Sequence, residues 1–221
     1  MLLQIKKTIE VKKHPLKYKE ALFLMEEEKK LILAGLSAGK IFLLEQEALY
    51  TAGSNSYEEN VKIHGTMIDG IPLLPSDRGG KITYHGPGQR IIYFVIRLLD
   101  FMSSIDLRAF IEKLEQIVIL TLKDFGITGE TIKEYPGVWV RSGKKLDKIA
   151  AVGLRISKGI TSHGLAINVN NSLEPFTKIN PCGINANNKG ITSLSLLLGE
   201  EIKLHRLDKV LINHIKNILT F

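Results

Sequence analysis

The sequence predicts an α/β domain of the α+β type, in which helices pack on one mixed sheet. Two observations carry this prediction: long amphipathic helical patterns, and a series of short apolar segments separated by glycine-rich turns. The helices do not alternate regularly with the strands, so a doubly wound parallel fold is not expected. No internal repeat or low-complexity linker divides the 221 residues, which favours a single domain over residues 1–221.

Three segments have the apolar spacing of amphipathic helices. The first covers residues 15–35 and the second covers residues 106–125, and each is closed by a glycine, Gly35 and Gly126. Glycine is common just after a helix because it adopts the left-handed backbone conformation without a steric penalty. The third segment begins at Arg206 and repeats the same pattern.

The strand-like segments are short and rich in Ile, Val and Leu. Glycine or charged residues bound many of them, as expected for strands joined by tight turns. They lie at residues 41–44, 81–84, 90–98, 138–141, 149–156 and 165–169.

The composition is that of an ordinary globular protein, with 44% hydrophobic and 24% charged residues. No apolar run approaches the roughly 18 residues of a membrane span, and the first residues lack the apolar core of a secretory signal. Because the chain also has a single cysteine, we expect a cytoplasmic protein with no membrane contact. The net charge of +7 favours acidic partners, but the lysines are dispersed and identify none.

A glycine-rich segment at residues 77–89 is the first candidate for a binding site. Its glycines allow the backbone to approach a ligand closely. Arg78 and His85 bracket a strand-like piece, so both side chains could reach the same concavity. The alternative is a tight hairpin in which residues 86–88 only form a turn. The spacing of a phosphate-binding P-loop is absent.

The second candidate starts at Lys148, at the head of an apolar strand, and continues through Ala151 to Gly153. A lysine near the interior exerts a stronger field than one on the surface, and the small residues after it leave room for a ligand. Residues 161–166 belong to the same candidate. The alternative is an edge-strand lysine whose amino group reaches water.

The third candidate is Cys182, which lies between Pro181 and Gly183. A lone cysteine is often an inert buried residue. Here the proline fixes the approach of the chain and the glycine removes bulk beside the sulfur, which favours a nucleophile. A thiol is mostly protonated at neutral pH, so a nearby cation such as Lys148 or a protonated His85 would favour the reactive thiolate.

Read together, these segments resemble the lipoyl(octanoyl) transferase family, the acyltransferases of lipoate biosynthesis. The resemblance runs from residues 50–53 to residues 190–194, and several motifs in the same order are more specific than any one of them. The motifs are Arg78-Gly79-Gly80, Thr83-Tyr84-His85-Gly86-Pro87-Gly88-Gln89, Gly137-Val138-Trp139-Val140, Lys148-Ile149-Ala150-Ala151-Val152-Gly153, His163-Gly164-Leu165-Ala166 and Pro181-Cys182-Gly183-Ile184.

The resemblance implies a fold similar to the catalytic domain of the biotin and lipoate protein ligases. It also implies that Cys182 carries the octanoyl group as a thioester and that Lys148 lowers the pKa of the thiol and transfers protons. His85 is expected to shape the pocket and not to act as an acid or base. The residues that match the acyl pocket of the family are Arg78, Gly79, Gly80, Lys81, Ile82, Thr83, Tyr84, His85, Ala151, Val152, Gly153, Gly164, Leu165 and Ala166.

The implied reaction is the first step of endogenous lipoate biosynthesis. The donor is octanoyl-acyl carrier protein, and the acceptors are the lipoyl domains of 2-oxoacid dehydrogenase complexes and the glycine cleavage H protein. No cofactor or metal is expected, because the donor thioester on phosphopantetheine is already activated. Both carriers are acidic in this family, which gives the positive charge of the chain a use.

The sequence departs from the family in two places. Gln46-Glu47-Ala48 stands where relatives often have His-Pro-Pro, and Asp147 precedes Lys148, where it could compete for the charge of the lysine. An ATP-dependent ligase of the same fold is one alternative, although the chain lacks an arginine- and glycine-rich adenylate loop. A basic module that binds nucleic acid is another, but no RNA-binding motif is present and we expect no nucleic-acid partner.

Overall fold

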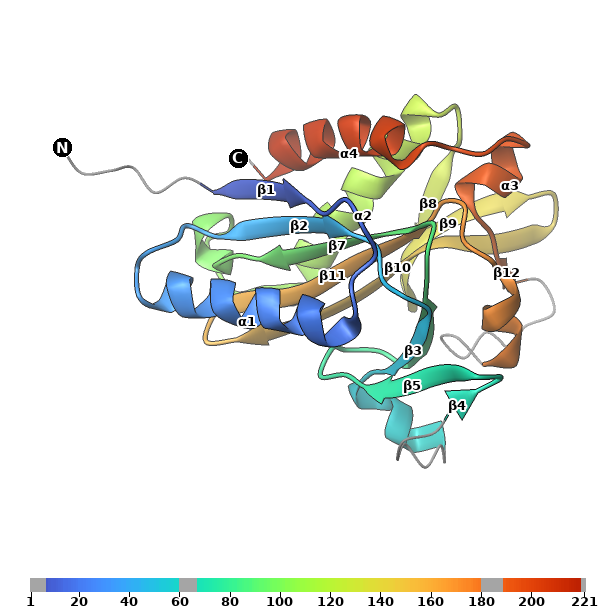
Figure 1. Ribbon diagram of the computed structural model, residues 1–221. Helices are drawn as coiled ribbons and strands as arrows, with labels where there is room; N and C mark the ends of the chain where they lie inside the picture. The colour runs from blue at the N-terminus through green and yellow to red at the C-terminus, as the bar shows by residue number, and fades with distance from the viewer. Residues whose placement is uncertain (1–6, 60–66, 180–188, 220–221) are drawn as a thin grey trace.

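The computed structural model describes residues 7–59, 67–179 and 189–219. A large mixed sheet has the strand order β1-β2-β7-β11-β10-β9-β8, and β12 lies beside one end of β10 (Figure 1). Most neighbours are antiparallel, whereas β1 with β2 and β10 with β12 are parallel. The bounds are β1 Thr8–Val11, β2 Lys40–Leu44, β7 Gln89–Val95, β8 Gly129–Ile132, β9 Tyr135–Ser142, β10 Lys145–Ser157, β11 Ile160–Asn168 and β12 Lys189–Ile191.

Helices cover both faces of this sheet (Figure 1). Helix α1 (Tyr18–Leu33) packs on the face of β2 and β7, while α2 (Leu107–Asp124) and α4 (Leu204–Ile218) pack on the opposite face. A short helix, α3 (Leu194–Leu198), precedes α4. The predicted fold class, helices on a mixed sheet, is confirmed. Of the helices described, none is both long and apolar enough to cross a membrane.

A second, smaller sheet was not predicted. Its order is β4-β5-β3-β6, and it faces the part of the large sheet that α1 leaves uncovered. Of its strands only β6 was predicted, as residues 81–84; β3 pairs with β5 and with β6 across long stretches of chain, which leave no periodic signal. The bounds are β3 Leu49–Ala52, β4 Met67–Ile68, β5 Ile71–Pro75 and β6 Ile82–His85, with single-turn helices η1 Ser54–Glu59, η2 Leu98–Asp100 and η3 Glu174–Lys178.

Most predicted elements are confirmed with corrected boundaries; the strands predicted from residues 138 and 149 begin at Tyr135 and Lys145, and the helix predicted from Arg206 begins at Leu204. The helices stop just before Gly35 and Gly126, which have φ angles of +71° and +76°. The strand predicted over residues 90–98 ends at Val95, because the chain turns there into η2. The strand predicted from residue 165 begins at Ile160: its first residues are polar yet buried, a combination that hydropathy does not identify as a strand.

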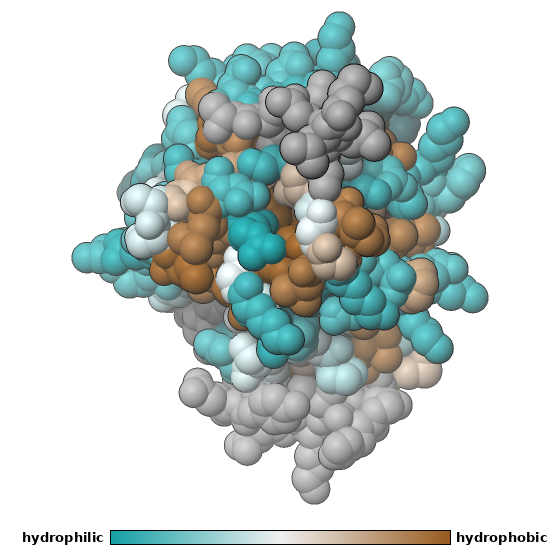
Figure 2. Space-filling model, turned by 90° about the vertical axis from the view of Figure 1, so that its left-hand side faces the viewer, coloured by the Kyte–Doolittle hydropathy of each residue, from teal (hydrophilic) through white to brown (hydrophobic). Residues whose placement is uncertain are grey.

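The face of the molecule viewed in Figure 2 mixes hydrophobic with hydrophilic residues. It includes the connection between α1 and β2, where Leu33 and Leu36 are exposed. Lysine and glutamate side chains of α1 pair along its outer surface, as in the contact of Lys30 Nζ with Glu27 Oε1 at 2.8 Å. Such exposed pairs add little stability.

Candidate active site

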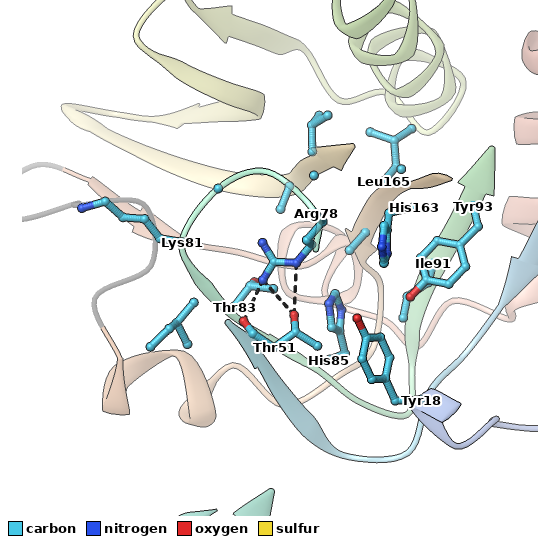
Figure 3. A pocket seen from close by; sticks show the side chains of 17 residues that line it. Tyr18, Thr51, Arg78, Lys81, Thr83, His85, Ile91, Tyr93, His163 and Leu165 are labelled. Atoms are coloured by element: carbon cyan, nitrogen blue, oxygen red, sulfur yellow. Dashed lines mark hydrogen bonds between the residues drawn. The ribbon is translucent and has the colours of Figure 1, made fainter. Parts of the chain in front are cut away.

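A cavity lies between the large sheet and the small sheet (Figure 3). Its floor is made of small residues on the neighbouring strands β10 and β11, where Ala151 pairs with Ala166 and Gly153 with Gly164. Larger side chains at Ala151 and Ala166 would fill the space above the sheet, and a β-carbon at Gly153 would press on the side chain of Arg78. The sequence therefore builds an open floor by placing small residues opposite one another.

The opposite wall comes from the segment that was expected to bind the acyl chain. Arg78 and His85 both line the cavity, as predicted from their positions at the two ends of a strand-like piece. The alternative of a simple hairpin is wrong, because β6 belongs to the small sheet and β7 to the large one. Residues 86–88 form the turn that carries the chain between the sheets, closed by the Gln89 N–H donating to the Gly86 carbonyl at 3.1 Å.

Arg78 is buried and held by the backbone of β3. Its Nη2 donates to the carbonyl of Thr51 at 2.7 Å, and its Nε donates to Thr51 Oγ1 at 3.1 Å (Figure 3). Gly53 is needed beside it, because a β-carbon there would collide with the carbonyl of Gly80. The guanidinium is thus a fixed positive charge in the cavity wall.

His85 is neutral in this site. Burial, and next the positive charge of Arg78, lowers the pKa of His85 from 6.5 to about 3. Its Nδ1 lies 2.8 Å from Gln89 Oε1, and Gln89 Nε2 donates to Asn168 Oδ1 at 2.9 Å. Since the amide oxygen of Gln89 is an acceptor, the proton of His85 is on Nδ1.

Three polar side chains close one end of the cavity, and only His163 of the three belongs to a segment that the sequence analysis selected. Figure 3 shows Tyr18, Tyr93 and His163 together at that end. Tyr18 donates to Ser76 Oγ at 2.8 Å and His163 Nε2 donates to Asp77 Oδ1 at 2.7 Å, so each has its own partner. The end wall is therefore rigid and already satisfied in hydrogen bonds.

Gln46, one of the residues that departs from the family pattern, supports this wall from behind. It is completely buried, and its Nε2 donates to the hydroxyl of Tyr93 at 3.0 Å. The departure thus leaves a polar side chain in contact with the end wall of the cavity.

A second cavity holds Lys148 and adjoins the first. The two share Thr83, Ala151 and Ala166. The remaining lining residues of the second cavity are Gln89, Lys148, Asn168, Phe176 and Ile191.

Lys148 is buried, with 3% of its surface exposed. Its Nζ donates to the carbonyl of Pro136 at 3.0 Å and lies 4.7 Å from the centre of the Trp139 ring. It sits inside β10, between β9 and β12, so the alternative of an edge-strand lysine reaching water is wrong. Asp147 precedes it in the strand, where successive side chains point to opposite faces.

A bulge in β10 turns Lys148 toward the cavities. Lys148 is opposite Trp139 and Ala150 is opposite Val138, so one extra residue is inserted in β10. Strict alternation would put Lys148 and Ala151 on opposite faces. The bulge brings both into the same cavity, while Ile149 and Ala150 face α2.

Most residues expected to bind the acyl chain line the first cavity. Lys81 does so with its amino group directed away from Arg78 and His85 (Figure 3). Two of the expected residues do not line the cavity. Tyr84 packs against Tyr50 and Phe176 in the core of the small sheet. The N–H of Gly79 donates to the carbonyl of Leu154 and so joins the loop to β10. The expected lining residues that the structure places there are Arg78, Gly80, Lys81, Ile82, Thr83, His85, Ala151, Val152, Gly153, Gly164, Leu165 and Ala166. Cys182 lies outside the described residues.

Comparison with known proteins identifies the family. The family described as the lipoyl protein ligase A/B catalytic domain matches residues 17–216. An octanoyltransferase of Rickettsia bellii is 37% identical over 198 residues, which cover 89% of this chain and 91% of that protein. An octanoyltransferase of Orientia tsutsugamushi is 42% identical over 191 residues, covering 86% and 89%. The chain belongs to the octanoyltransferase family. The predicted family and the predicted class of enzyme, an acyltransferase, are confirmed.

Solved structures show the same fold at much lower identity. A bipartite lipoate protein ligase of Thermoplasma acidophilum has a TM-score of 0.70 at 14% identity, covering 98% of this chain and 84% of that one. The biotin protein ligase of Aquifex aeolicus has a TM-score of 0.54 at 15% identity, covering 98% and 70%. The octanoyltransferase chain therefore shares its fold with ligases of both kinds, as predicted.

Proposed function

We propose that this chain transfers an octanoyl group from octanoyl-acyl carrier protein to the lysine of a lipoyl domain, through a thioester on Cys182. The observation that carries the proposal is the buried ammonium of Lys148 beside a cavity with a floor of small residues. Phe176 and Ile191, which precede and follow Cys182 in the sequence, line the cavity that contains Lys148.

The apolar chain of the substrate is proposed to occupy the first cavity. Burying about six methylenes at roughly 0.8 kcal/mol each contributes around 5 kcal/mol to binding. Ile91, Val152 and Leu165 supply apolar contacts there. The carbonyl end then points through the boundary at Thr83, Ala151 and Ala166 toward Lys148.

The first half-reaction is proposed to load the enzyme. Lys148 has taken the proton of the Cys182 thiol and is an ammonium, and the thiolate attacks the carbonyl carbon of the donor thioester. The new carbon–sulfur bond forms as the bond to the phosphopantetheine sulfur breaks. That sulfur leaves as a thiolate and takes up the proton of the Lys148 ammonium, so that octanoyl-Cys182, a free thiol and a neutral Lys148 amine result.

The second half-reaction is proposed to transfer the group. The neutral amine of the acceptor lysine attacks the carbonyl of octanoyl-Cys182 and loses one proton to the neutral Lys148 amine. The Cys182 sulfur leaves as a thiolate, which restores the thiolate and the Lys148 ammonium. The product is an amide. No ATP is consumed, because the thioester supplies the driving force.

Lipoyl domains are the proposed acceptors because of the relatives of this fold. The structural study of the Thermoplasma acidophilum ligase describes a lipoylation system together with its E2 lipoyl domain. Lipoyl domains and acyl carrier proteins are expected to be acidic, so the net charge of +7 would speed the association of each with this chain. Added salt would reduce this increase in the association rate.

Intact-mass analysis after mixing with octanoyl-acyl carrier protein tests the proposal. We expect the mass of one octanoyl group to be gained, to be removed by hydroxylamine, and to be absent in Cys182→Ala. Lys148→Met keeps an unbranched apolar side chain but removes the charge, and should reduce transfer by about 10²- to 10⁴-fold.

An ATP-dependent ligase would behave differently. It would modify a lipoyl domain with free octanoate and ATP and take nothing from the carrier protein. That result, or full activity of Lys148→Met, would contradict the proposal.

A further inference from the structure

Glu115 is a charged residue on the buried side of α2. It is 5% exposed, and its Oε1 accepts a hydrogen bond from the N–H of Gly137 at 2.7 Å. Burial raises the pKa of the Glu115 carboxyl, while the hydrogen bond from Gly137 and the positive charge of Lys148 act in the opposite direction. A buried acid retained in an otherwise apolar helix face requires a reason.

The partner of Glu115 belongs to the same peptide group that contacts Lys148. The N–H of Gly137 and the carbonyl of Pro136 are the two ends of one peptide unit. The carbonyl accepts from Lys148 Nζ at 3.0 Å, so a single peptide joins the carboxylate to the ammonium. Charges at both ends polarise the peptide in the same sense, and this strengthens both hydrogen bonds.

The peptide also connects two sides of the large sheet. α2 packs on the face that carries Val138 and Ala150, whereas Lys148 lines the cavity on the other face. The influence of Glu115 therefore reaches Lys148 without a direct contact between the side chains.

The backbone at this point has little freedom to move. Gly137 has a φ angle of +122°, and a β-carbon there would collide with the carbonyl of Ala150. Trp139, whose ring faces the ammonium, is fully buried.

We propose that Glu115 is a positioning residue for Lys148: acting through the Pro136–Gly137 peptide, it fixes the ammonium in the cavity. The proposal rests on the role given to Lys148 in the proposed function. Glu115 does not touch the substrate in this scheme. Its negative charge matters because a nearby anion stabilises a cation.

Other charged groups surround the contact, and a pH profile contains their contributions. Glu112 raises the pKa of Glu115 from the same helix, one turn earlier. The charged residues on the elements packed around the contact include, in the described part of the chain, Arg108, Glu112, Glu130, Lys133, Asp147 and Lys189.

Two substitutions of Glu115 separate its charge from its hydrogen bond. Glu115→Gln keeps an oxygen that can accept from Gly137 but removes the charge. We expect the alkaline limb of the kcat/KM profile, where Lys148 loses its proton, to move to lower pH by about one unit. Glu115→Ala removes both features and should lower kcat by up to roughly a hundredfold, because the ammonium is misplaced. KM for octanoyl-acyl carrier protein should stay the same.

Glu112→Gln is the matched control. It makes the same chemical change on the same helix, but Glu112 is exposed and pairs with Arg108 at 3.4 Å. We expect its kcat and alkaline limb to match those of the unmodified chain. Circular dichroism shows whether each variant folds. If Glu115→Ala does not fold, the alkaline limb of Glu115→Gln alone tests the proposal.

A wild-type profile for Glu115→Gln would overturn the proposal, since the charge would then have no influence on Lys148. Failure of the proposed function has a different signature: no octanoyl group on the unmodified chain, or full activity of Lys148→Met. Failure of the Glu115 proposal is therefore measured on Glu115→Gln, and failure of the proposed function on the unmodified chain or on Lys148→Met.

Discussion

The imidazole of His163 donates from Nε2 to Oδ1 of Asp77 over 2.7 Å, and this contact joins β11 to the loop that carries Arg78. His163 has a φ angle of +59°, in the left-handed region that is costly for a residue other than glycine. Arg155 pairs with the other oxygen of Asp77 at 3.2 Å. Asp77 therefore holds two strands in place at the end wall of the cavity.

Asp77→Asn should lower stability in a pH-dependent way. The hydrogen bond from His163, and then the charges of His163 and Arg155, lower the pKa of Asp77 from 3.8. A carboxyl whose pKa is lower in the folded state than in the unfolded state stabilises the folded state at pH values above the unfolded pKa. This stabilisation is lost as the pH falls through the folded-state pKa. Because Asp77 is half exposed, we expect a difference of about 1 kcal/mol or less in the free energy of unfolding at pH 7.

Urea unfolding of both proteins from pH 7 to pH 2.5 measures this difference. The difference in free energy of unfolding between the unmodified chain and Asp77→Asn should shrink as the pH falls below 3.8. A constant difference over that range would show that the charge of Asp77 is not involved.

His85→Asn should remove part of the acid sensitivity of the fold. The pKa of His85 is lowered from 6.5 to about 3, so below pH 6.5 the unfolded chain binds a proton that the folded chain does not. Stability is then lost as the pH falls from 6.5 toward 3. At pH 4 this amounts to about 3 kcal/mol, which asparagine avoids because it has no proton to gain.

The free energy of unfolding of the unmodified chain and of His85→Asn, measured against pH, checks this prediction. The activity of His85→Asn tests separately whether His85 acts as an acid or base. Since His85 is neutral at working pH and lines the cavity wall, kcat/KM of His85→Asn should keep the acidic limb of the unmodified chain. Loss of that limb would show that His85 acts as an acid or base.

Ala151→Val should slow the transfer of octanoyl and of shorter acyl groups alike. Ala151 lies where the two cavities meet, so added methyl groups narrow the passage between the proposed tail site and Lys148. Overpacking of this kind costs about 1–3 kcal/mol, so octanoyl and hexanoyl transfer, measured by mass, should each fall by roughly tenfold or more with their ratio unchanged. Ala166→Val, at the paired position, should have the same effect. Unchanged rates in both variants would remove the acyl chain from this passage.

Arg90→Met should destabilise the fold without affecting the chemistry. Arg90 on β7 and Asp208 on α4 form a buried pair, with Nη2 donating to Oδ2 at 3.0 Å and Nε 2.9 Å from Oδ1. Burial raises the pKa of Asp208 despite the charge of Arg90. Removing one partner leaves a buried charge and costs about 3–5 kcal/mol. Thermal unfolding measures the loss, and the double variant with Asp208→Leu should recover most of it. If the double variant were as unstable as the single one, the packing of Arg90 and not its charge would be responsible.

The helices were predictable because their apolar residues repeat over many turns. The segments around Arg78 and Lys148 were found as motifs, yet periodicity could not show that they meet. A bulge changes the face on which Lys148 lies, and the small sheet depends on pairings between distant segments. Such contacts arise from the fold and leave no local pattern.

Glu115, which the sequence analysis missed, and His163, which it named only within a motif, both had a signal in the sequence. Glu115 interrupts the apolar face of its helix, four residues after Ile111 and three before Val118. A charged residue at such a position is expected to have a buried partner. His163 had a weaker signal, a polar residue among glycine and apolar residues, and its contact with Asp77 required the structure.

Strand β10 runs for thirteen residues and has Lys148 near one end, the floor of small residues at its middle, and Arg155 near the other end. With a rise of roughly 3.3 Å per residue, the proposed chemistry at Lys148 and the proposed binding of the hydrocarbon tail share one backbone. Because successive side chains point to opposite faces, one residue inserted or deleted between Lys148 and Ala151 would turn the lysine away from the floor. Whether this segment holds an odd or an even number of residues therefore decides if the amino group and the tail site meet.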